Sequence, residues 1–415
     1  MRKKSLGRIC TSILVPAMIA GMLFGFSAPG KSANDTQADD QNRTGQAAEL
    51  VQDTELATEN ETQAAASENL NPDMEDMDAM SVVHDMRIGW NIGNTLDATK
   101  DGLLPNEPAY KCETAWGNPS VTQELVDAVL DSGFNVVRVP VSWVNHVGAA
   151  PDYEISEAWM SRVQEVVDYA YDKGAYVILN LHHEDWNYPY YDNEEAACER
   201  MRIMWSQIAE RFKDYDEHLI FEAQNEPRKV GTPQEWNGGD QEGWDVVNAT
   251  NAAFVDTIRN AGGSNPYRML MIPGYGANST VGIQHIDIPK GDNRIIVSVH
   301  AYSPYNFALN KNGTSEWNND TYDIDKLMSD LKSLFIDNGV PVIIGEFGAM
   351  NKDNEDERVA WATYYLGAAK EIGVPCIWWD NGAFSGSGEL FGLFNRYTGE
   401  VEYPSLLDAM MKATE

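Results

Sequence analysis

Gly-Ala-Tyr-Val-Ile-Leu-Asn-Leu-His-His, at residues 174–183, is the stretch that decides the fold prediction. In it a glycine follows a helical segment, an apolar run comes next, and polar side chains end the run. Glycine is favoured where a helix ends in a left-handed turn. An unbroken apolar run is typical of a parallel strand that is buried on both faces. The same order of features recurs at Gly133 before 136–139, at Gly339 before 342–346 and at Gly373 before 376–380.

Amphipathic segments separate these runs, which indicates helices between the strands. Ser120 and Gln123 predict a capping box at the start of one of these helices, because apolar residues at helical spacing follow them. Further helices are expected at 156–172, 194–212, 243–261, 323–337, 356–371 and 404–412. Further strands are expected at 87–91, 219–224, 268–272 and 295–300.

Eight strands that alternate with helices fill residues 81–415. They predict an α/β fold with a single closed (β/α)8 TIM barrel and no second domain. A doubly wound open sheet is the alternative. It would usually carry a glycine-rich phosphate loop after an early strand, and the sequence shows none. We therefore predict one domain over residues 75–415.

Two segments are expected before the barrel. Residues 1–30 combine a basic N-terminal segment, an apolar run and small residues after that run, which is the pattern of a signal peptide. An uncleaved membrane anchor is the alternative reading of the same run. Residues 31–74 are rich in acids and lack aromatic residues, so they predict an acidic, disordered, low-complexity linker. We expect a secreted protein that touches a membrane only through the signal segment, if that segment stays uncleaved.

The charge of the chain excludes several kinds of partner. Its 64 acidic and 30 basic residues give a formal net charge of −34. Nucleic acids and anionic lipids bind clustered Lys and Arg, so we expect no nucleic-acid partner. Its 4 cysteines are too few for a disulfide scaffold. Among Cys112, Cys198 and Cys376, which follow the signal segment, one bridge at most is expected.

Polar side chains end most of the predicted strands. The C-terminal ends of parallel barrel strands share one face, so these side chains are expected at one mouth. Glu226 and Glu346, from strands that face each other, predict acid/base or glycosyl-transfer chemistry, with one carboxyl protonated and the other ionised. The alternative is that each Glu is a structural ion pair. The candidate residues are Asn94, Asp97, Arg138, His182, His183, Asn225, Glu226, His300, Tyr302, Glu346 and Trp379.

A metal site is a competing interpretation of the histidines at this mouth. His182, His183, His300 and Glu346 are residue types that bind zinc at barrel strand ends. Adjacent residues on a strand point to opposite faces, so only one of the two neighbouring histidines is expected to face the mouth. No H-x-H or H-E-x-x-H pattern is present. We therefore expect neither a metal nor another cofactor.

Aromatic residues in the loops indicate the chemistry of the ligand. The flat C–H faces of sugar rings pack on aromatic side chains, while their hydroxyls need Asn, Asp, Glu and His. For any single Trp, ordinary core packing is the more common outcome. As a group, the loop aromatics favour an extended, open carbohydrate cleft. They are Tyr110, Trp116, Trp143, Trp186, Tyr188, Tyr190, Tyr191, Trp236, Trp244, Trp317 and Trp379.

Six segments, taken together and in order, resemble glycoside hydrolase family five, the cellulase family. The first and the Trp-Trp-Asp-Asn-Gly segment at 378–382 are similar to its bacterial endoglucanase and xyloglucanase branch. The resemblance covers about residues 75–413. The segments are Gly-Trp-Asn-Ile-Gly-Asn-Thr-Leu-Asp-Ala (89–98), Arg-Val-Pro (138–140), Asn-Leu-His-His (180–183), Asn-Glu-Pro (225–227), His-Ala-Tyr (300–302) and Gly-Glu-Phe-Gly (345–348).

The resemblance implies a retaining endo-β-1,4-glucanase. Glu226 would be the general acid and later the base, and Glu346 the nucleophile. The resemblance also implies that Arg138 and Tyr302 bond Glu346 and that His300 orients Glu226. Asn225 would hold the 2-hydroxyl of the reacting sugar, His182, with His183 beside it, would contact that sugar, and Trp379 would stack under it. Asn94 and Asp97 would bind the next sugar unit.

Three functions compete on the sequence alone. The first is a secreted endo-β-1,4-glucanase that cuts internal bonds of plant cell-wall glucans. Xyloglucanase, lichenase and mannanase activity by the same mechanism stay open, because a few loop contacts decide among such polymers. The second is a metal-dependent barrel hydrolase, and the third a glycan-binding protein without activity. The expected partner is a β-glucan polysaccharide or oligosaccharide, and the expected state is a monomer.

Overall fold

The structure is a computed structural model that describes residues 74–415. The predicted signal peptide (1–30) lies outside the described residues, as does the predicted linker (31–74) except Met74. None of the described helices is both long and apolar enough to cross a membrane. In this part of the chain Cys112, Cys198 and Cys376 are buried and free, which resolves the open question of a bridge among them.

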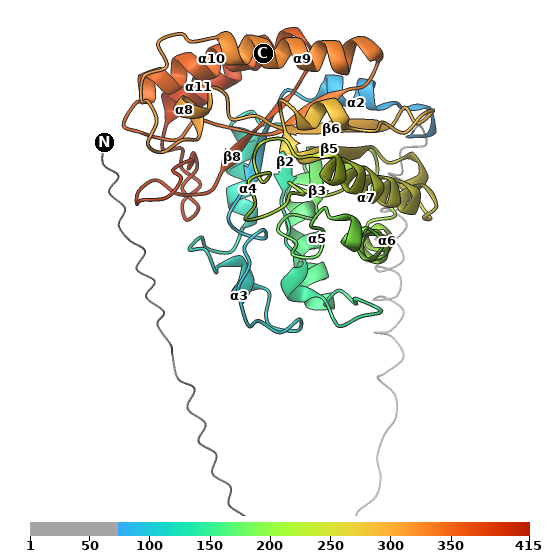
Figure 1. Ribbon diagram of the computed structural model, residues 1–415. Helices are drawn as coiled ribbons and strands as arrows, with labels where there is room; N and C mark the ends of the chain where they lie inside the picture. Colours follow the sequence, from blue (N-terminus) through green and yellow to red (C-terminus); the bar gives the residue numbers. More distant parts are fainter. Residues whose placement is uncertain (1–73) are drawn as a thin grey trace, which may run out of the picture. The chain divides into compact units, whose positions relative to one another are not determined.

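Eight parallel strands form a closed barrel, as predicted, in the order of the sequence. β1 pairs with β2 on one side and with β8 on the other, so the sheet has no edge and the open-sheet alternative is wrong. The centre of Figure 1 shows several of these strands. The strands are β1 (Ile88–Ile92), β2 (Val136–Val139), β3 (Tyr176–Asn180), β4 (Leu219–Glu222), β5 (Leu270–Asn278), β6 (Ile295–His300), β7 (Val342–Phe347) and β8 (Cys376–Asp380).

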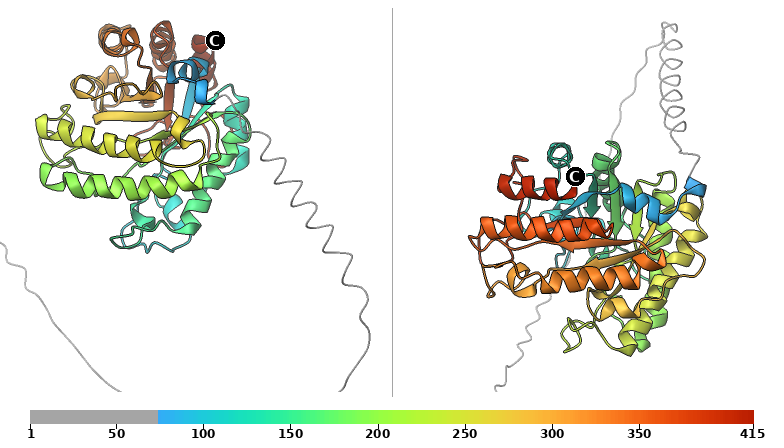
Figure 2. Two further views of the ribbon diagram at one scale, coloured as in Figure 1. Left: turned by 90° about the vertical axis from the view of Figure 1, so that its right-hand side faces the viewer. Right: turned by 90° about the horizontal axis from the view of Figure 1, so that it is seen from above.

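Helices cover the outside of the barrel, as Figures 1 and 2 show. Between β5 and β6 the described chain has only a short 3-10 turn, Gly282–His285, in place of a helix. α3 (Tyr110–Glu113) and α8 (Tyr305–Ala308) are single turns within loops. The long helices are α4 (Gln123–Asp131), α5 (Glu157–Tyr171), α6 (Glu194–Arg211), α7 (Gln241–Arg259), α9 (Tyr322–Leu334), α10 (Glu355–Glu371) and α11 (Pro404–Thr414).

The start of α4 differs from the predicted capping box. Thr122, not Ser120, is the N-cap, and its Oγ1 accepts the backbone N–H of Leu125 at 3.3 Å. Gln123 is the first helical residue and donates to Asp127 Oδ1 instead of closing a box. Thr and Ser are both good caps, so composition alone could not choose between neighbouring candidates.

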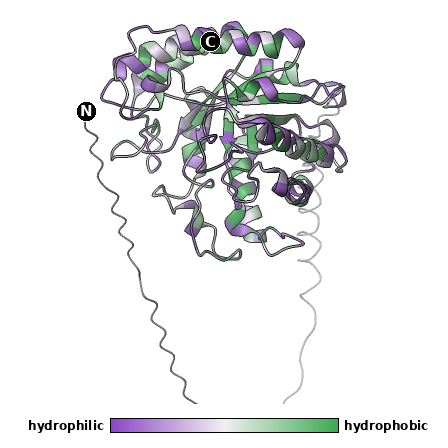
Figure 3. Cartoon of the chain, in the orientation of Figure 1, coloured by the Kyte–Doolittle hydropathy of each residue, from purple (hydrophilic) through white to green (hydrophobic). Residues whose placement is uncertain are grey.

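Apolar side chains, most of them branched, fill the barrel interior. α2 (Ala79–Asp85) leads directly into β1 and packs its apolar face on this interior cluster, so it covers the N-terminal end opposite the mouth. Figure 3 shows hydrophobic residues along the strands and hydrophilic residues on the loops and outer helix surfaces. The strand residues of the cluster are Val136, Tyr176, Ile178, Ile220, Met271, Ile296, Ile343 and Ile377.

The four glycines that predicted helix ends all have positive φ, between 71° and 108°. We expect Gly373→Ala (φ 71°) to lower the free energy of unfolding by about 1 kcal/mol, because an L side chain is strained in this region. No heavy atom lies within 4 Å of its added Cβ, so the cost is conformational alone. Gly367, inside α10 and with equally open space, is the control: alanine there should stabilise. Denaturant unfolding of both variants checks the opposite signs, and equal signs would contradict the argument.

Candidate active site

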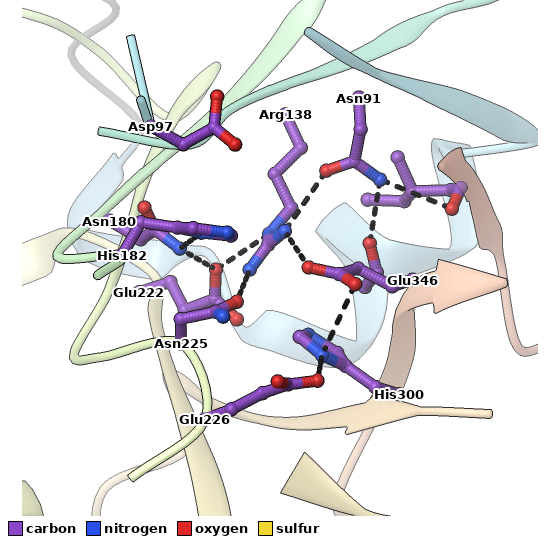
Figure 4. A network of polar contacts seen from close by, with 12 residues as sticks. Asn91, Asp97, Arg138, Asn180, His182, Glu222, Asn225, Glu226, His300 and Glu346 are labelled. Atoms are coloured by element: carbon purple, nitrogen blue, oxygen red, sulfur yellow. Dashed lines mark hydrogen bonds and ion pairs between the residues drawn. The ribbon is translucent and has the colours of Figure 1, made fainter. Parts of the chain in front are cut away.

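The strand ends bring most of the candidate residues together at one mouth (Figure 4). Glu346 lies near the end of β7 and His300 is the last residue of β6, and these two strands pair side by side. Asn225 and Glu226 follow β4, and Arg138 projects from β2. The convergence follows from closure, because the C-terminal ends of parallel barrel strands meet at one face.

Arg138 donates hydrogen bonds to four side chains of the site. Its side chain is fully buried, and its Nη1 donates to Oε1 of Glu346 at 2.9 Å. Nη2 donates to Oδ1 of Asn225 at 2.8 Å, and Nε donates to Oε2 of Glu222 at 2.7 Å. Asn91 Oδ1 accepts a further bond from Nη1 at 3.0 Å. A planar guanidinium with every nitrogen engaged holds these partners in one fixed arrangement.

Glu226 and Glu346 face the same small volume. One carboxylate oxygen of each, together with a ring nitrogen of His300, lie within 4.8 Å of one another. Nδ1 of His300 lies 2.8 Å from Glu226 Oε1 and 3.6 Å from Glu346 Oε2. The hydroxyl of Tyr302 donates to Glu346 Oε2 at 2.8 Å. Both oxygens of Glu346 therefore accept hydrogen bonds, which favours its ionised form.

The electrostatics of the pair depend on burial and on His300. Burial and the nearby Glu226 raise the pKa of Glu346, against the charges of His300 and Arg138. Burial also disfavours the ionised form of Glu226, but the His300 hydrogen bond and charge and the charge of Arg228 lower its pKa. Although burial favours the neutral ring, Glu346 and Glu226 raise the pKa of His300. The contact between Glu226 and His300 contributes to both of these opposite pKa shifts, so the protonation of one depends on that of the other.

His182 and His183 both lie at the mouth, which corrects the expectation of opposite faces. Their ring centroids are 4.5 Å apart, and the ring of His182 lies parallel to Trp379 at 5.8 Å. Side chains alternate between faces only within a strand, and β3 ends at Asn180, before the histidines. Asn180 Nδ2 donates to Nδ1 of His182 at 3.2 Å, so the ring carries its proton on Nε2. Burial lowers the pKa of His182 well below its usual value, which keeps it neutral.

Asn94 and Asp97 belong to the turn that follows β1. Both carboxylate oxygens of Asp97 accept backbone N–H groups, from Thr95 at 2.7 Å and Asn94 at 3.0 Å. The Asp97 side chain is 0% exposed, and burial raises its pKa to about 7. Asn94 is partly exposed and has φ of 57°. These bonds make Asp97 the organiser of the turn that carries Asn94, and binding of the next sugar unit by the two residues stays a prediction.

A comparison with known families gives the first match. Residues 96–385 match the family described as "Cellulase (glycosyl hydrolase family 5)". The chain belongs to glycosyl hydrolase family 5.

Two endoglucanases are similar over most of the described chain. Endoglucanase B of Neocallimastix patriciarum is 53% identical over 343 residues, which cover 82% of this chain and 72% of that protein. Endoglucanase A of Ruminococcus albus is 47% identical over 349 residues, which cover 82% of this chain and 94% of that protein.

Solved family 5 structures share the fold. A GH5-4 broad specificity endoglucanase from Ruminococcus champanellensis with bound cellotriose has a TM-score of 0.79 and 50% identity, covering 81% of this chain and 99% of that one. A lichenase mutant from Caldicellulosiruptor sp. F32, in complex with cellotetraose, has a TM-score of 0.77 and 43% identity, covering 81% and 95%. A xyloglucan-specific endo-beta-1,4-glucanase from a metagenomic library, in complex with cellotriose, has a TM-score of 0.77 and 44% identity, covering 80% and 98%.

Sequence reasoning missed two residues that support the site, Glu222 and Asn91. Glu222, the last residue of β4, is fully buried and accepts bonds from Arg138, Asn180 and Ser298. Asn91 fixes the strand ends by donating to the carbonyl of Gly345 at 2.9 Å. The available signal was a polar residue inside an otherwise apolar strand run, since such groups are buried only with partners.

The loop aromatics differ in burial. Trp143 and Trp317 belong to the hydrophobic core, which is the ordinary packing that is more common for a single Trp. Tyr110, Trp116, Tyr191 and Trp236 are exposed. Trp236 lies over the guanidinium of Arg228 at 4.1 Å, and Arg228 Nη1 donates to the backbone carbonyl of Glu226 at 3.0 Å.

Three groups of described side chains have the spacing of metal ligands; one, Asp216 with Glu217 and His218, precedes β4, and the other two lie at the mouth. The two at the mouth are Glu226 with His300 and Glu346, and Asp97 with His182 and His183. In the first group Glu346 also bonds Arg138, and in the second Asp97 bonds two backbone N–H groups. The hydrogen bonds of the two groups are explained without an ion, although the ligand types suit zinc.

Proposed function

We propose that this family 5 chain is a retaining endo-β-1,4-glucanase in which Glu226 and Glu346 carry the reaction. The observation that carries the proposal is the spacing of the two carboxylates, with an oxygen of each within 4.8 Å. Retaining glycosidases place their carboxyl groups about 5–5.5 Å apart, whereas inverting enzymes leave about 6.5–9.5 Å for a water molecule. The endoglucanase relatives support the choice of a β-1,4-linked glucan.

The reaction proceeds in two displacements. Ionised Glu346 attacks the anomeric carbon, and Glu226 gives its proton to the glycosidic oxygen as the bond to the leaving sugar breaks. Glu226, now a carboxylate, takes a proton from water, whose oxygen displaces Glu346 and restores both groups. Arg138 and Tyr302 aim and stabilise Glu346 throughout, because they bond its two oxygens.

The neighbouring side chains suit a sugar in the first subsite. Oδ1 of Asn225 accepts from Arg138, so its Nδ2 is left to donate to the 2-hydroxyl. The neutral ring of His182 offers its Nε2–H to another hydroxyl, with His183 beside it. Trp379 supplies the aromatic platform under that sugar, and Asn94 contacts the next unit, on a turn that Asp97 holds in place.

The decisive experiment is hydrolysis of a panel of soluble polymers with product sizing. We expect internal cleavage of a soluble cellulose derivative and of mixed-linkage glucan. The lichenase and xyloglucan-specific structures add mixed-linkage glucan and xyloglucan as substrates to compare. Hydrolysis of mannan alone, or no reducing-end release from any polymer, would overturn the assignment. Turnover that resists a chelator is expected, and loss of activity that zinc restores would favour the metal-dependent alternative.

We propose further that the protein acts outside the cell as a monomer. The basic start and apolar run of residues 1–30 support export, although they lie outside the described residues. N-terminal sequencing of protein recovered from culture medium tests the cleavage, and a native mass measurement tests the monomer.

His300→Asn is expected to narrow the pH profile of kcat/KM. Because the pKa of His300 is raised, its proton is lost only above the usual histidine range, and we expect this loss to set the alkaline limb. Without the ring, Glu226 holds the proton alone, so the alkaline limb should move down by about one pH unit or more. The acid limb should rise, because His300 also lowers the pKa of Glu346.

Tyr302→Phe is the matched variant for this profile. It removes only a bond that lowers the pKa of Glu346, so the acid limb alone should rise. Measured kcat/KM between about pH 4 and 9 distinguishes the two variants. An alkaline limb that His300→Asn leaves in place would show that His300 does not hold the proton of the acid.

A further inference from the structure

A third carboxylate lies beneath the two proposed catalytic ones. Glu222 ends β4 and is 0% exposed, and the reaction described above does not use it (Figure 4). Oε2 accepts Nε of Arg138 at 2.7 Å and Nδ2 of Asn180 at 3.2 Å. Oε1 accepts the hydroxyl of Ser298 at 2.6 Å. The contact with Arg138 Nε is a fully buried salt bridge, so Glu222 is the anionic partner of that guanidinium.

The consequence of this third acid is a charge imbalance. Glu222 and Glu346 both bond the single guanidinium of Arg138, whose one positive charge cannot balance two buried anions. Glu226 adds a third carboxylate within the same cluster. Water is largely excluded there, so unbalanced charge is costly and the cluster retains a proton.

We propose that Glu222 is a positioning residue for the hydrolysis: it fixes the Arg138 guanidinium and takes up part of its charge, so that a proton stays with Glu226 and His300. This rests on the function proposed above. Because Arg138 is also paired with Glu222, it stabilises Glu346 enough to aim it without suppressing its nucleophilicity. The negative charge of Glu222 also holds the acid's proton in the cluster.

Other titratable and charged groups also face the cluster, and the test variants must leave these residues unchanged. Asn180 and Ser298 are neutral, and His182 stays neutral because burial lowers its pKa. Arg228 lies 3.6 Å from Glu226 at the partly exposed rim. The full set is Asp97, Arg138, His182, His183, Glu226, Arg228, His300, Tyr302, Glu346 and Glu389.

Glu222→Gln isolates the charge from the geometry. Its amide oxygen can still accept from Arg138 and Asn180, and its NH2 can donate to Ser298, whose hydroxyl can turn to accept. Loss of one negative charge should lower the pKa of every neighbouring acid. Both limbs of the kcat/KM profile should therefore move to lower pH together, by about 0.5–1.5 pH units. A packing defect would lower activity without moving the limbs.

Glu113→Gln is the matched control. Glu113 is 1% exposed and accepts two bonds from Arg162 on the outside of the barrel, at 2.7 and 3.2 Å. It should lower thermal stability yet leave both limbs in place.

The experiment measures pH profiles of wild type, Glu222→Gln and Glu113→Gln on a chromogenic cello-oligosaccharide, with melting curves of each. A parallel acidward shift in Glu222→Gln alone supports the proposal. Limbs that stay within about 0.2 pH units of wild type in a folded Glu222→Gln protein overturn it. If that variant does not fold, Glu222→Asp replaces it. Asp keeps the negative charge, so both limbs should stay in place while kcat falls. A shift of the limbs to lower pH in Glu222→Asp would refute the charge role. A wild type that cleaves no β-glucan would instead overturn the proposed function.

Discussion

Glu346→Gln is expected to lower kcat/KM for β-glucan by at least about four orders of magnitude, which is about 5.5 kcal/mol of transition-state stabilisation. The reason is chemical: an amide cannot form the glycosyl-enzyme bond, whereas Gln still fills the space beside Arg138 and Tyr302. Binding of a cello-oligosaccharide should change little, because the surrounding side chains remain. Initial rates together with calorimetric binding check both halves of this expectation.

The control for this variant is Tyr302→Phe, which keeps the nucleophile and removes one of its hydrogen bonds. It should lose far less activity than Glu346→Gln. If Glu346→Gln retained more than about a hundredth of the wild-type rate, a nucleophilic role would be untenable.

Glu226→Gln should show a loss that depends on the leaving group. On polymer, removal of the general acid should cost about 10²–10⁴-fold in kcat/KM. On an aryl cellobioside with a nitrophenol leaving group, which needs no proton, the first displacement should stay fast. Hydrolysis of the glycosyl-enzyme should then be slow, because Glu226 is also the base, and a burst of nitrophenol is expected.

Added azide tests the role of Glu226 as the base in hydrolysis of the glycosyl-enzyme. This small anion needs no base, so it should restore turnover of Glu226→Gln and form a β-glycosyl azide. Equal losses on polymer and aryl substrate, without a burst, would mean that Glu226 does not act on the leaving group.

The barrel could be predicted from sequence because its signals are local. The apolar run at 295–300 coincides with β6, and the glycine before 376–380 ends α10 in a left-handed turn. Parallel strands then dictate the mouth: polar residues at strand ends must meet once the sheet closes. This is why Glu226, Glu346, Arg138 and His300 could be placed together without coordinates.

Other features depend on contacts between distant segments. The strand β5 extends to Asn278, six residues beyond its predicted end, along an irregular register with β6. Thr122 caps α4 although Ser120 is an equally good cap by composition. His183 shares the mouth with His182 only because β3 stops before them.

The charge balance of the site also could not be predicted from the sequence. Glu222 precedes Glu226 by four residues, yet only the fold shows that it bonds the same Arg138 that bonds Glu346. The two backbone N–H bonds that Asp97 accepts likewise became visible only in the structure.

Covalent labelling tests the central claim most directly, namely that residues 226 and 346 act on one anomeric carbon from either side. A 2-deoxy-2-fluoro cellobioside with a good leaving group should form a glycosyl-enzyme that breaks down slowly, because the fluorine destabilises both oxocarbenium-like transition states. Digestion and mass spectrometry of the labelled protein should place the sugar on Glu346. An adduct on any other residue, Glu226 included, or an inverted product from the wild type, would contradict the account.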